Sequence, residues 1–424
     1  MIRLDWVRRM KILIYGINYS PELTGIGKYT SEMASWCAAD GHEVRVITSP
    51  PYYPEWRVSK LYKNGYSNAH TDGVRVTRCP LFVPSRPTAL TRLLHLFSFS
   101  VSSALPVLGS LFWKPDIVIQ VVPTLFCSFQ TLILSRLSGA KAVVHIQDYE
   151  VDAMFGLSMF SGGKVRRCVL WIEQKILNRF DLVSTISDGM MQRAEKKGVR
   201  SNKLIFFPNW SEIERFSNAG KNINLLKELG IEESKKIVLY SGNMGEKQGL
   251  EVVINAAKRM ELNTEIHFLM VGDGAAKLKL EQLANSLSLT NMTFLPLQPY
   301  EKFPEFLASA NCHLVIQKSG VADSVLPSKL TNILAVGGNA VITAYSDTTL
   351  GSLCAKFEGI ATLVDPESES ALQYGILTTL NMPEPNFIAR QYAQDHLDKN
   401  VVLTRFIAEI TQGEKNEPSP GFAD

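Results

Sequence analysis

The segment 237–250 most constrains the fold of this chain. Its first four residues form an apolar run typical of a strand, three glycines follow in the next stretch, and a helical pattern comes after them. A strand, a glycine-rich turn and a helix in this order predict a parallel sheet covered by helices. Glycines let a ligand approach the backbone, and helix N-termini attract anions. We therefore expect Gly242, Asn243 and Lys247 to surround a diphosphate, although the same glycines also suit a plain connecting loop.

The second half of the chain repeats this pattern. A strand predicted at 265–271 ends in another glycine turn, made of Gly272, Asp273 and Gly274. A strand predicted at 293–297 leads to Gln298, whose loop offers backbone groups to a nucleobase. Because both segments follow strand ends, we count them with the predicted ligand site.

A cation stands near the start of the helix predicted at 328–336. Ser328 and Lys329 open this helix, so that a positive charge lies beside exposed helix N–H groups. This arrangement suits a diphosphate, and we expect it to complement the turn at Gly242.

The first half of the chain begins with another βαβ unit. A strand at 12–15, a helix at 28–39 and a strand at 44–48 enclose a loop that contains Gly25 and Gly27. This loop lacks the third glycine of a dinucleotide-binding turn, and no acidic residue ends the second strand to hold a ribose. A nicotinamide dehydrogenase is therefore disfavoured, while both glycines stay candidates for the close approach of a ligand.

A strand predicted at 142–148 ends in polar residues. Ligands bind beyond the carboxyl ends of strands in open α/β sheets, so His145 and Asp148 stand where chemistry is expected. The structural alternative is a histidine that bonds a backbone carbonyl and an aspartate that caps the next turn. We favour the functional interpretation because Glu150 and Asp152 follow closely.

Length, charge and cysteine content limit the classes of protein. The 424 residues exceed the size at which one hydrophobic core keeps growing, so we expect two domains. The 44 Lys and Arg against 41 Asp and Glu give no reason to expect a nucleic acid as partner. The six cysteines form no C-x-x-C pair, which argues against a zinc site or disulfide framework and fits the cytoplasm. No apolar signal segment precedes Met10, which is an alternative start.

An uncharged run at 93–113 approaches the length of a membrane span. Arg86 and Arg92 precede it and Lys114 follows it, whereas five serines and Pro106 lower its hydropathy. We expect a pair of helices that is buried or partly faces a membrane, rather than a transmembrane helix. Any contact with lipid is expected at the membrane surface.

The motifs together resemble a GT-B glycosyltransferase of family GT4. The resemblance covers 11–406 and rests on the glycine loop after the first strand, the two later glycine turns and three further features. These features are His145 and Asp148 at a strand end, a hinge at 208–209, and the P-S-K-L segment at 327–330. The resemblance implies an α/β protein with two Rossmann-like parallel-sheet domains that face each other across a cleft.

Four parts of the chain follow from this resemblance. An acceptor-binding domain is expected at 10–207 and a nucleotide-sugar-binding domain at 208–385. A C-terminal helix at 386–412 is expected to cross back to the first domain, and a disordered tail is expected at 413–424.

The implied reaction is a retaining sugar transfer from a GDP- or UDP-linked sugar. The chain is most similar to family members that assemble bacterial exopolysaccharide such as colanic acid, which implies GDP-fucose as donor and a polyprenyl-diphosphate-linked saccharide as acceptor. Such an enzyme works in the cytoplasm, peripherally on the inner face of the plasma membrane. No D-x-D motif occurs, so we expect neither a metal nor another cofactor. Lys329 would stabilise the leaving group, and His145 and Asp148 would orient the sugar or the acceptor hydroxyl.

Two blocks depart from the family pattern. The family's G-R-L-x-x-x-K-G block has its Arg and Lys where this chain has Asn243 and Gln248, so Lys247 stands one position early. Of the family's two glutamates the second falls on Asn332, while Asp323 lies one residue before the position of the first. Asn332 would bond a ribose hydroxyl more weakly than a carboxylate does. Lys329 is therefore the cation that we expect to matter most.

Two other functions stay open. A GT-B-fold UDP-sugar epimerase would convert a nucleotide sugar without an acceptor. A non-catalytic scaffold for polysaccharide assembly would leave cellular polysaccharide intact after Lys329→Ala.

Overall fold

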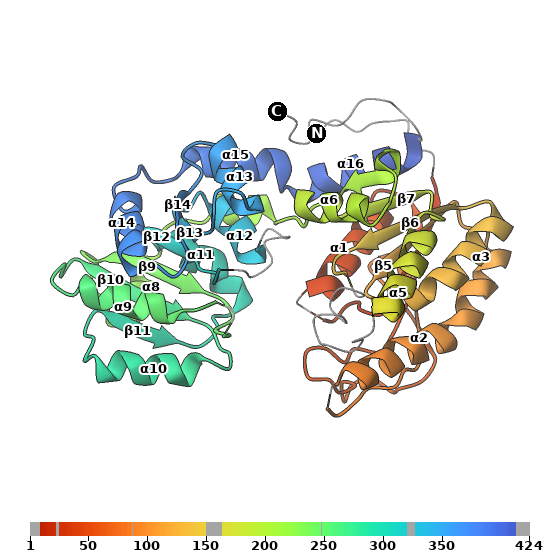
Figure 1. The fold of residues 1–424 in the computed structure, drawn as a ribbon, viewed down its shortest axis with the longest axis horizontal. Coiled ribbons are helices and arrows are strands. Elements are labelled where there is room, and N and C mark those ends of the chain that lie inside the picture. Colours follow the sequence, from red (N-terminus) through yellow and green to blue (C-terminus); the bar gives the residue numbers. More distant parts are fainter. Residues whose placement is uncertain are drawn as a thin grey trace. The chain divides into compact units, whose positions relative to one another are not determined.

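The computed structural model divides the chain into two compact units. It describes residues 9–22, 25–86, 88–149, 163–246, 248–319 and 327–412. Unit 1 runs to Phe207 and includes the chain from Arg405 onward, and unit 2 runs from Pro208 to Thr404. Figure 1 shows helices around a sheet in each unit. The division between the main parts of the two units falls where the sequence places the hinge.

Unit 1 is built on an eight-stranded sheet with the order β3-β4-β2-β1-β5-β6-β7-β8. Every neighbouring pair is parallel except β3 and β4, which form an antiparallel hairpin at one edge. The central strands are buried apolar runs, as a sheet covered on both faces requires. The strands are β1 Lys11–Tyr15, β2 Glu43–Thr48, β3 Ser67–Thr71, β4 Val74–Arg78, β5 Ile117–Val122, β6 Lys141–Ile146, β7 Leu182–Thr185 and β8 Leu204–Phe206.

The helices of unit 1 connect these strands. Helix α1 begins three residues earlier than the sequence predicts, at Gly25, where a left-handed backbone starts the helix. The helices are α1 Gly25–Ala39, α2 Ala89–Gly109, α3 Ser128–Ser138, α5 Gly163–Leu177 and α6 Asp188–Lys196, with short 3-10 turns η1 Ser110–Phe112, η2 Leu125–Cys127 and η3 Ser201–Lys203.

The uncharged run forms one long helix, which corrects the predicted helix pair. Thr88 caps α2 through a capping box with Thr91, and the helix continues through Pro106. Proline has no N–H for the carbonyl of Ser102 one turn earlier, and the Tyr66 hydroxyl donates to that carbonyl at 2.8 Å instead. The proline also lies in the last turn, so the helix ends soon after it.

Unit 2 contains a fully parallel six-stranded sheet with the order β11-β10-β9-β12-β13-β14. Its strands are β9 Lys236–Ser241, β10 Ile266–Val271, β11 Met292–Leu295, β12 Cys312–Val315, β13 Ala340–Thr343 and β14 Thr362–Val364. Its helices are α7 Ile213–Ser217, α8 Ile223–Glu228, α9 Glu251–Arg259, α10 Lys277–Ser286, α11 Phe303–Ala308, α12 Ser328–Val336, α13 Thr349–Lys356, α14 Glu369–Thr379 and α15 Phe387–His396, with η4 Tyr300–Lys302. Both sheets confirm the predicted Rossmann-like class.

The C-terminal segment consists of two helices instead of the single predicted one. Asn386 caps α15, which packs against α12 within unit 2. The helical structure is interrupted after His396, and Asp398 forms an isolated parallel β-bridge with Ser211. Helix α16, Lys399–Gln412, follows, and its residues from Arg405 belong to unit 1. The predicted tail at 413–424 lies outside the described residues.

Candidate functional site

The first glycine turn of unit 2 meets the start of α12 at the switch point of the sheet. Strands β9 and β12 are neighbours, but their chain connections run in opposite directions across the sheet, which opens a crevice at their carboxyl ends. Gly242 follows β9, and Lys329 lies in the first turn of α12. A Cβ atom added to Gly242 would lie 3.2 Å from the Lys329 Nζ. The structure thus brings together the two residues that the sequence assigns to one diphosphate site.

The Lys329 ammonium rests on Tyr240. Its Nζ donates to the Tyr240 hydroxyl at 3.1 Å and lies 4.2 Å from the centre of the ring. Burial lowers the pKa of Lys329 to about 8. Among the described residues no carboxylate forms an ion pair with it. A partly desolvated cation without a counter-ion attracts an anionic ligand.

The two glycine turns interlock. The Gly242 N–H donates to the Val271 carbonyl at 2.9 Å. Gly272, at φ 148°, comes so close that a Cβ there would overlap the carbonyl oxygen of Gly242. A Cβ at Gly274, at φ 150°, would lie 2.5 Å from the carbonyl oxygen of Met244. The missing side chains of Gly272 and Gly274 therefore make room for the first turn, and their part in donor binding stays a prediction.

The polar residues of the two turns hold the loops in place. The Asn243 carbonyl accepts the Tyr240 hydroxyl at 2.6 Å, while its own side chain is exposed. Asp273 accepts the N–H of Gly274 at 2.8 Å. Each residue therefore shapes its own turn, and the exposed Asn243 amide is the part left to face a ligand.

Lys318, which no sequence pattern points to as a site residue, lies near the start of α9. Lys247 is outside the described residues, and the Gln248 side chain turns back to accept the Gly245 N–H at 3.1 Å. Lys318, which follows β12, instead crosses Gly249, where an added Cβ would lie 2.6 Å from the Lys318 Cγ. No local pattern signals this lysine, because its neighbours come from a distant part of the chain.

The remaining predicted donor residues have different environments. Asp323 lies outside the described residues, and only the backbone of Ser328 is described. Asn332 Oδ1 accepts the Ser211 hydroxyl at 2.8 Å. Gln298 donates to a backbone carbonyl two residues earlier at 3.0 Å. Their roles in donor binding stay predictions.

His145 lies inside the core of unit 1, and this corrects the expectation that it faces a substrate. Its side chain is 2% exposed, and its Nδ1 lies 3.0 Å from the Ser184 hydroxyl. The ring packs against Phe207 at 4.8 Å and Phe406 at 6.4 Å between ring centres. Burial lowers the pKa of His145 to about 3, so the ring is neutral. The reason is strand alternation: the residue is still within β6, and its side chain points into a covered face.

Asp148 stands beyond the carboxyl end of β6, as the sequence predicts. Its side chain is exposed, yet the surroundings of the carboxyl are desolvating enough to raise its pKa. Of the predicted pair, only Asp148 therefore lies where an acceptor hydroxyl can reach it.

The two glycines of the first loop have different surroundings. Gly25 adopts φ 61° and has open space where a Cβ would lie, as expected for a residue that a ligand can approach. Gly27 is buried, and a Cβ there would lie 2.9 Å from Oε2 of Glu22. Gly27 thus accommodates Glu22, which accepts the backbone N–H groups of Tyr52 and Tyr53 at 3.1 Å each. The prediction that Gly27 also lies close to a ligand stays a prediction.

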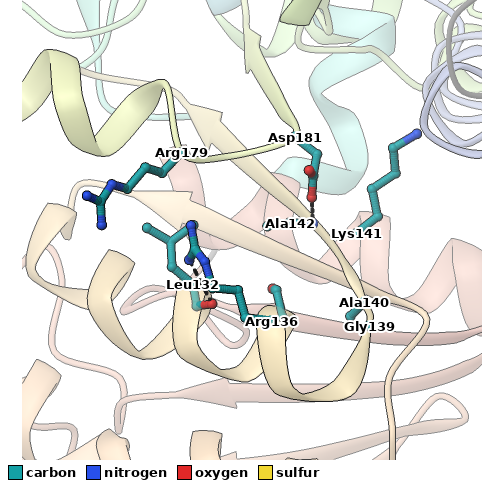
Figure 2. A pocket seen from close by; sticks show the side chains of 9 residues that line it. Leu132, Arg136, Gly139, Ala140, Lys141, Ala142, Arg179 and Asp181 are labelled. Atoms are coloured by element: carbon teal, nitrogen blue, oxygen red, sulfur yellow. Dashed lines mark hydrogen bonds between the residues drawn. The ribbon is translucent and has the colours of Figure 1, made fainter.

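A groove of about 500 Å³ lies elsewhere in unit 1, at the amino ends of β6 and β7. Its polar groups mostly bond the protein itself: Asp181 accepts the Ala142 N–H at 2.7 Å, and Lys141 donates to a carbonyl of α16 at 2.7 Å. Figure 2 shows Lys141 pointing away from the guanidinium groups of Arg136 and Arg179. Because ligands of such sheets bind at the carboxyl ends of strands, we assign this groove no part in the reaction.

Metal ligands do not gather in the described ranges. No group of three or more His, Cys, Asp or Glu residues there is placed to hold an ion. Metal independence stays a prediction from the missing D-x-D motif.

Comparison with known proteins agrees with this geometry. The glycosyl transferase 4-like domain matches residues 24–210, and the model of glycosyl transferases group 1 matches residues 222–396. The chain is 55% identical over 406 residues to the Escherichia coli (strain K12) protein named "Putative colanic acid biosynthesis glycosyl transferase WcaI", covering 95% of this chain and 100% of that protein. The chain belongs to the GT4 glycosyltransferases. This enzyme is therefore a glycosyltransferase, with the predicted fold.

Solved structures of low sequence identity share the fold of this GT4 glycosyltransferase. HepE of Anabaena, solved in complex with UDP and glucose, has a TM-score of 0.66 at 15% identity and covers 95% of this chain and 100% of its own. A glycosyltransferase of Rickettsia africae has a TM-score of 0.69 at 13% identity, with coverage of 96% and 100%. At these identities the likeness shows the GT-B fold alone.

Proposed function

We propose that this glycosyltransferase moves L-fucose from GDP-fucose to a polyprenyl-diphosphate-linked saccharide in the assembly of colanic acid or a closely similar exopolysaccharide. The main observation behind the proposal is that the Lys329 ammonium lies beside Gly242, where the strand order of the unit 2 sheet reverses. The pathway is supported by the relative that is 55% identical, and a nucleotide-sugar donor by HepE, which was solved with UDP and glucose.

The positive charge of Lys329 favours a reaction in which negative charge develops on the leaving diphosphate. The bond between the anomeric carbon and the donor phosphate breaks, and the acceptor oxygen bonds to the same face of that carbon. The acceptor proton passes to an oxygen of the leaving diphosphate, so no protein nucleophile is needed. Lys329 and the N-terminus of α12 stabilise the negative charge that develops on the diphosphate. Asp148 orients the acceptor hydroxyl.

A lipid-linked acceptor is supported by an apolar stripe on α2. The stripe residues recur at helical spacing and are between 49% and 79% exposed: Leu90, Leu94, Phe97, Val101 and Leu105. Phe97 continues the stripe toward α3 through an edge contact with Phe126 at 5.9 Å, and the two helices pack side by side (Figure 1). Arg86, Arg92 and Lys114 lie near its ends. Apolar surface with basic flanks is typical of proteins that bind a membrane surface.

The other face of α2 keeps the helix on unit 1. Among the described helices only this one is long and apolar enough to cross a membrane, and 39% of it is buried. Ser103 bonds the Tyr15 hydroxyl at 2.5 Å, and His95 bonds the Phe82 carbonyl at 2.5 Å. Leaving the domain would expose these groups to lipid, which is costly. We therefore propose peripheral attachment at the cytoplasmic face of the inner membrane.

A panel of nucleotides tests the proposed donor. GDP, UDP, GDP-fucose and other GDP- and UDP-sugars are added to the purified chain, and the thermal unfolding temperature is measured. A ligand at about 100 times its dissociation constant stabilises by about 2.7 kcal/mol, which gives a clear upward shift. We expect the largest shift with GDP compounds. A protein that none of these compounds stabilises would contradict the transferase mechanism.

Product analysis separates the alternative functions. We expect release of GDP from GDP-fucose only when a lipid-linked saccharide is present. Conversion of a UDP-sugar without acceptor would identify an epimerase. Intact cellular polysaccharide after Lys329→Ala would favour a non-catalytic scaffold.

A further inference from the structure

We propose that Tyr240 is a positioning residue that holds the Lys329 ammonium at the diphosphate-binding point. The inference rests on the proposed role of Lys329. The sequence gives no indication of this role, because Tyr240 ends an apolar run that reads as a buried strand.

The Tyr240 hydroxyl bonds both parts of the predicted diphosphate site, the glycine turn after β9 and the start of α12. Its hydroxyl accepts the Lys329 Nζ at 3.1 Å and donates to the Asn243 carbonyl at 2.6 Å. One oxygen atom thus joins the glycine turn after β9 to the first turn of α12. The side chain is 0% exposed, so the packing around it fixes its position.

The hydroxyl and the ring act on the lysine in different ways. The ring face attracts the ammonium from 4.2 Å but does not fix its direction. The hydroxyl is directional, and it leaves the other N–H groups of the ammonium for phosphate oxygens. Since no carboxylate among the described residues pairs with Lys329, this contact orients the charge without neutralising it.

Tyr240→Phe tests this inference because it keeps the ring and removes the hydroxyl. We expect the dissociation constant for GDP to rise about tenfold, which corresponds to about 1.4 kcal/mol. The dissociation constant for guanosine, which has no diphosphate, should stay within about twofold. Calorimetric titration with both compounds measures the difference. Tyr374→Phe, on a side chain that is 70% exposed in the same unit, is the matched control and should leave both constants unchanged.

A double-mutant cycle shows whether Tyr240 acts through Lys329. In the Lys329→Met background, Tyr240→Phe should cause no further loss of GDP affinity. If the two losses multiply, or if Tyr240→Phe weakens guanosine as much as GDP, the positioning role is wrong. If Lys329→Met leaves GDP affinity unchanged, the proposed function of Lys329 fails instead. If Lys329→Met weakens GDP and Tyr240→Phe does not, only the inference about Tyr240 is overturned.

Discussion

The Lys329 Nζ lies 3.2 Å from the point where a Cβ of Gly242 would be, so a glycine of the turn after β9 and a lysine of the first turn of α12 form one surface. Lys329→Ala should lower turnover at least about 100-fold, because one stabilising group for developing charge contributes about that much. The urea midpoint at neutral pH should not fall much, because the lost hydrogen bond to Tyr240 is offset by the removal of a desolvated charge. Retained turnover would contradict the assignment.

The affinity for nucleoside diphosphate should depend on pH through Lys329. Burial lowers its pKa from 10.5 to about 8, so the ligand-free protein loses this charge as the pH rises through about 8. GDP should therefore bind more weakly above that pH, with a loss approaching tenfold per pH unit. Stability without ligand should change in the opposite direction: between about pH 8 and 10.5 the unfolded chain binds the proton that the folded chain has lost, so unfolding free energy rises.

Lys329→Arg is the control for this pH dependence. Arginine stays charged throughout this range, so the decrease in GDP affinity above about pH 8 should disappear even if the affinity itself changes. Titration of GDP at pH 7, 8 and 9 checks both proteins. The same decrease in Lys329→Arg would assign the titration to another group.

Alanine substitutions should separate glycines needed for packing from a glycine with open space. Gly272→Ala places a methyl group on the Gly242 carbonyl oxygen at a positive φ, and should lower the unfolding free energy by about 3 kcal/mol or more. Gly25→Ala has the positive φ but meets no atom of the described residues within 4 Å, and should cost about 1 kcal/mol. Urea unfolding measures both variants. Equal losses of unfolding free energy in the two variants would mean that backbone strain, and not the overlap with Gly242, causes the loss.

His145 should make unit 1 sensitive to acid. Burial holds its pKa at about 3, against an ordinary 6.5, so below about pH 6.5 the unfolded chain binds a proton that the folded chain does not. Unfolding free energy should therefore fall by up to about 1.4 kcal/mol per pH unit toward pH 3. Urea midpoints at several pH values should show a smaller slope for His145→Gln than for the parent protein.

A second readout decides what His145 does. If it is a core residue, His145→Gln should reduce turnover only as far as it reduces the folded fraction. A complete loss of turnover at an unchanged urea midpoint would show that the ring serves the reaction after all.

The fold could be predicted from the sequence because strand runs and glycine turns are local signals. The segment 237–250 is enough to indicate a strand, a turn and a helix, and the P-S-K-L segment starts a helix where expected. The site is predicted less completely, since Tyr240 and Lys318 lie there through contacts between distant parts of the chain, which no local pattern reveals. His145 shows the opposite limit: position near a strand end does not reveal which face the side chain occupies.

Membrane attachment should depend on the α2 stripe. Val101→Asp and Leu105→Asp replace side chains that are 57% and 79% exposed, so neither change disturbs the buried face of the helix. Burying one such side chain in lipid contributes about 1.5 to 3 kcal/mol, so each variant should bind vesicles at least about tenfold more weakly. Co-sedimentation with vesicles of phosphatidylcholine and phosphatidylglycerol measures this binding. Leu262→Asp, at a position that is 95% exposed in unit 2, is the control and should bind as the parent protein does. If the α2 variants co-sediment with vesicles as well as the parent protein does, the stripe does not bind lipid. If the parent protein is a dimer and the variants are monomers, the stripe contacts a second copy of the chain instead.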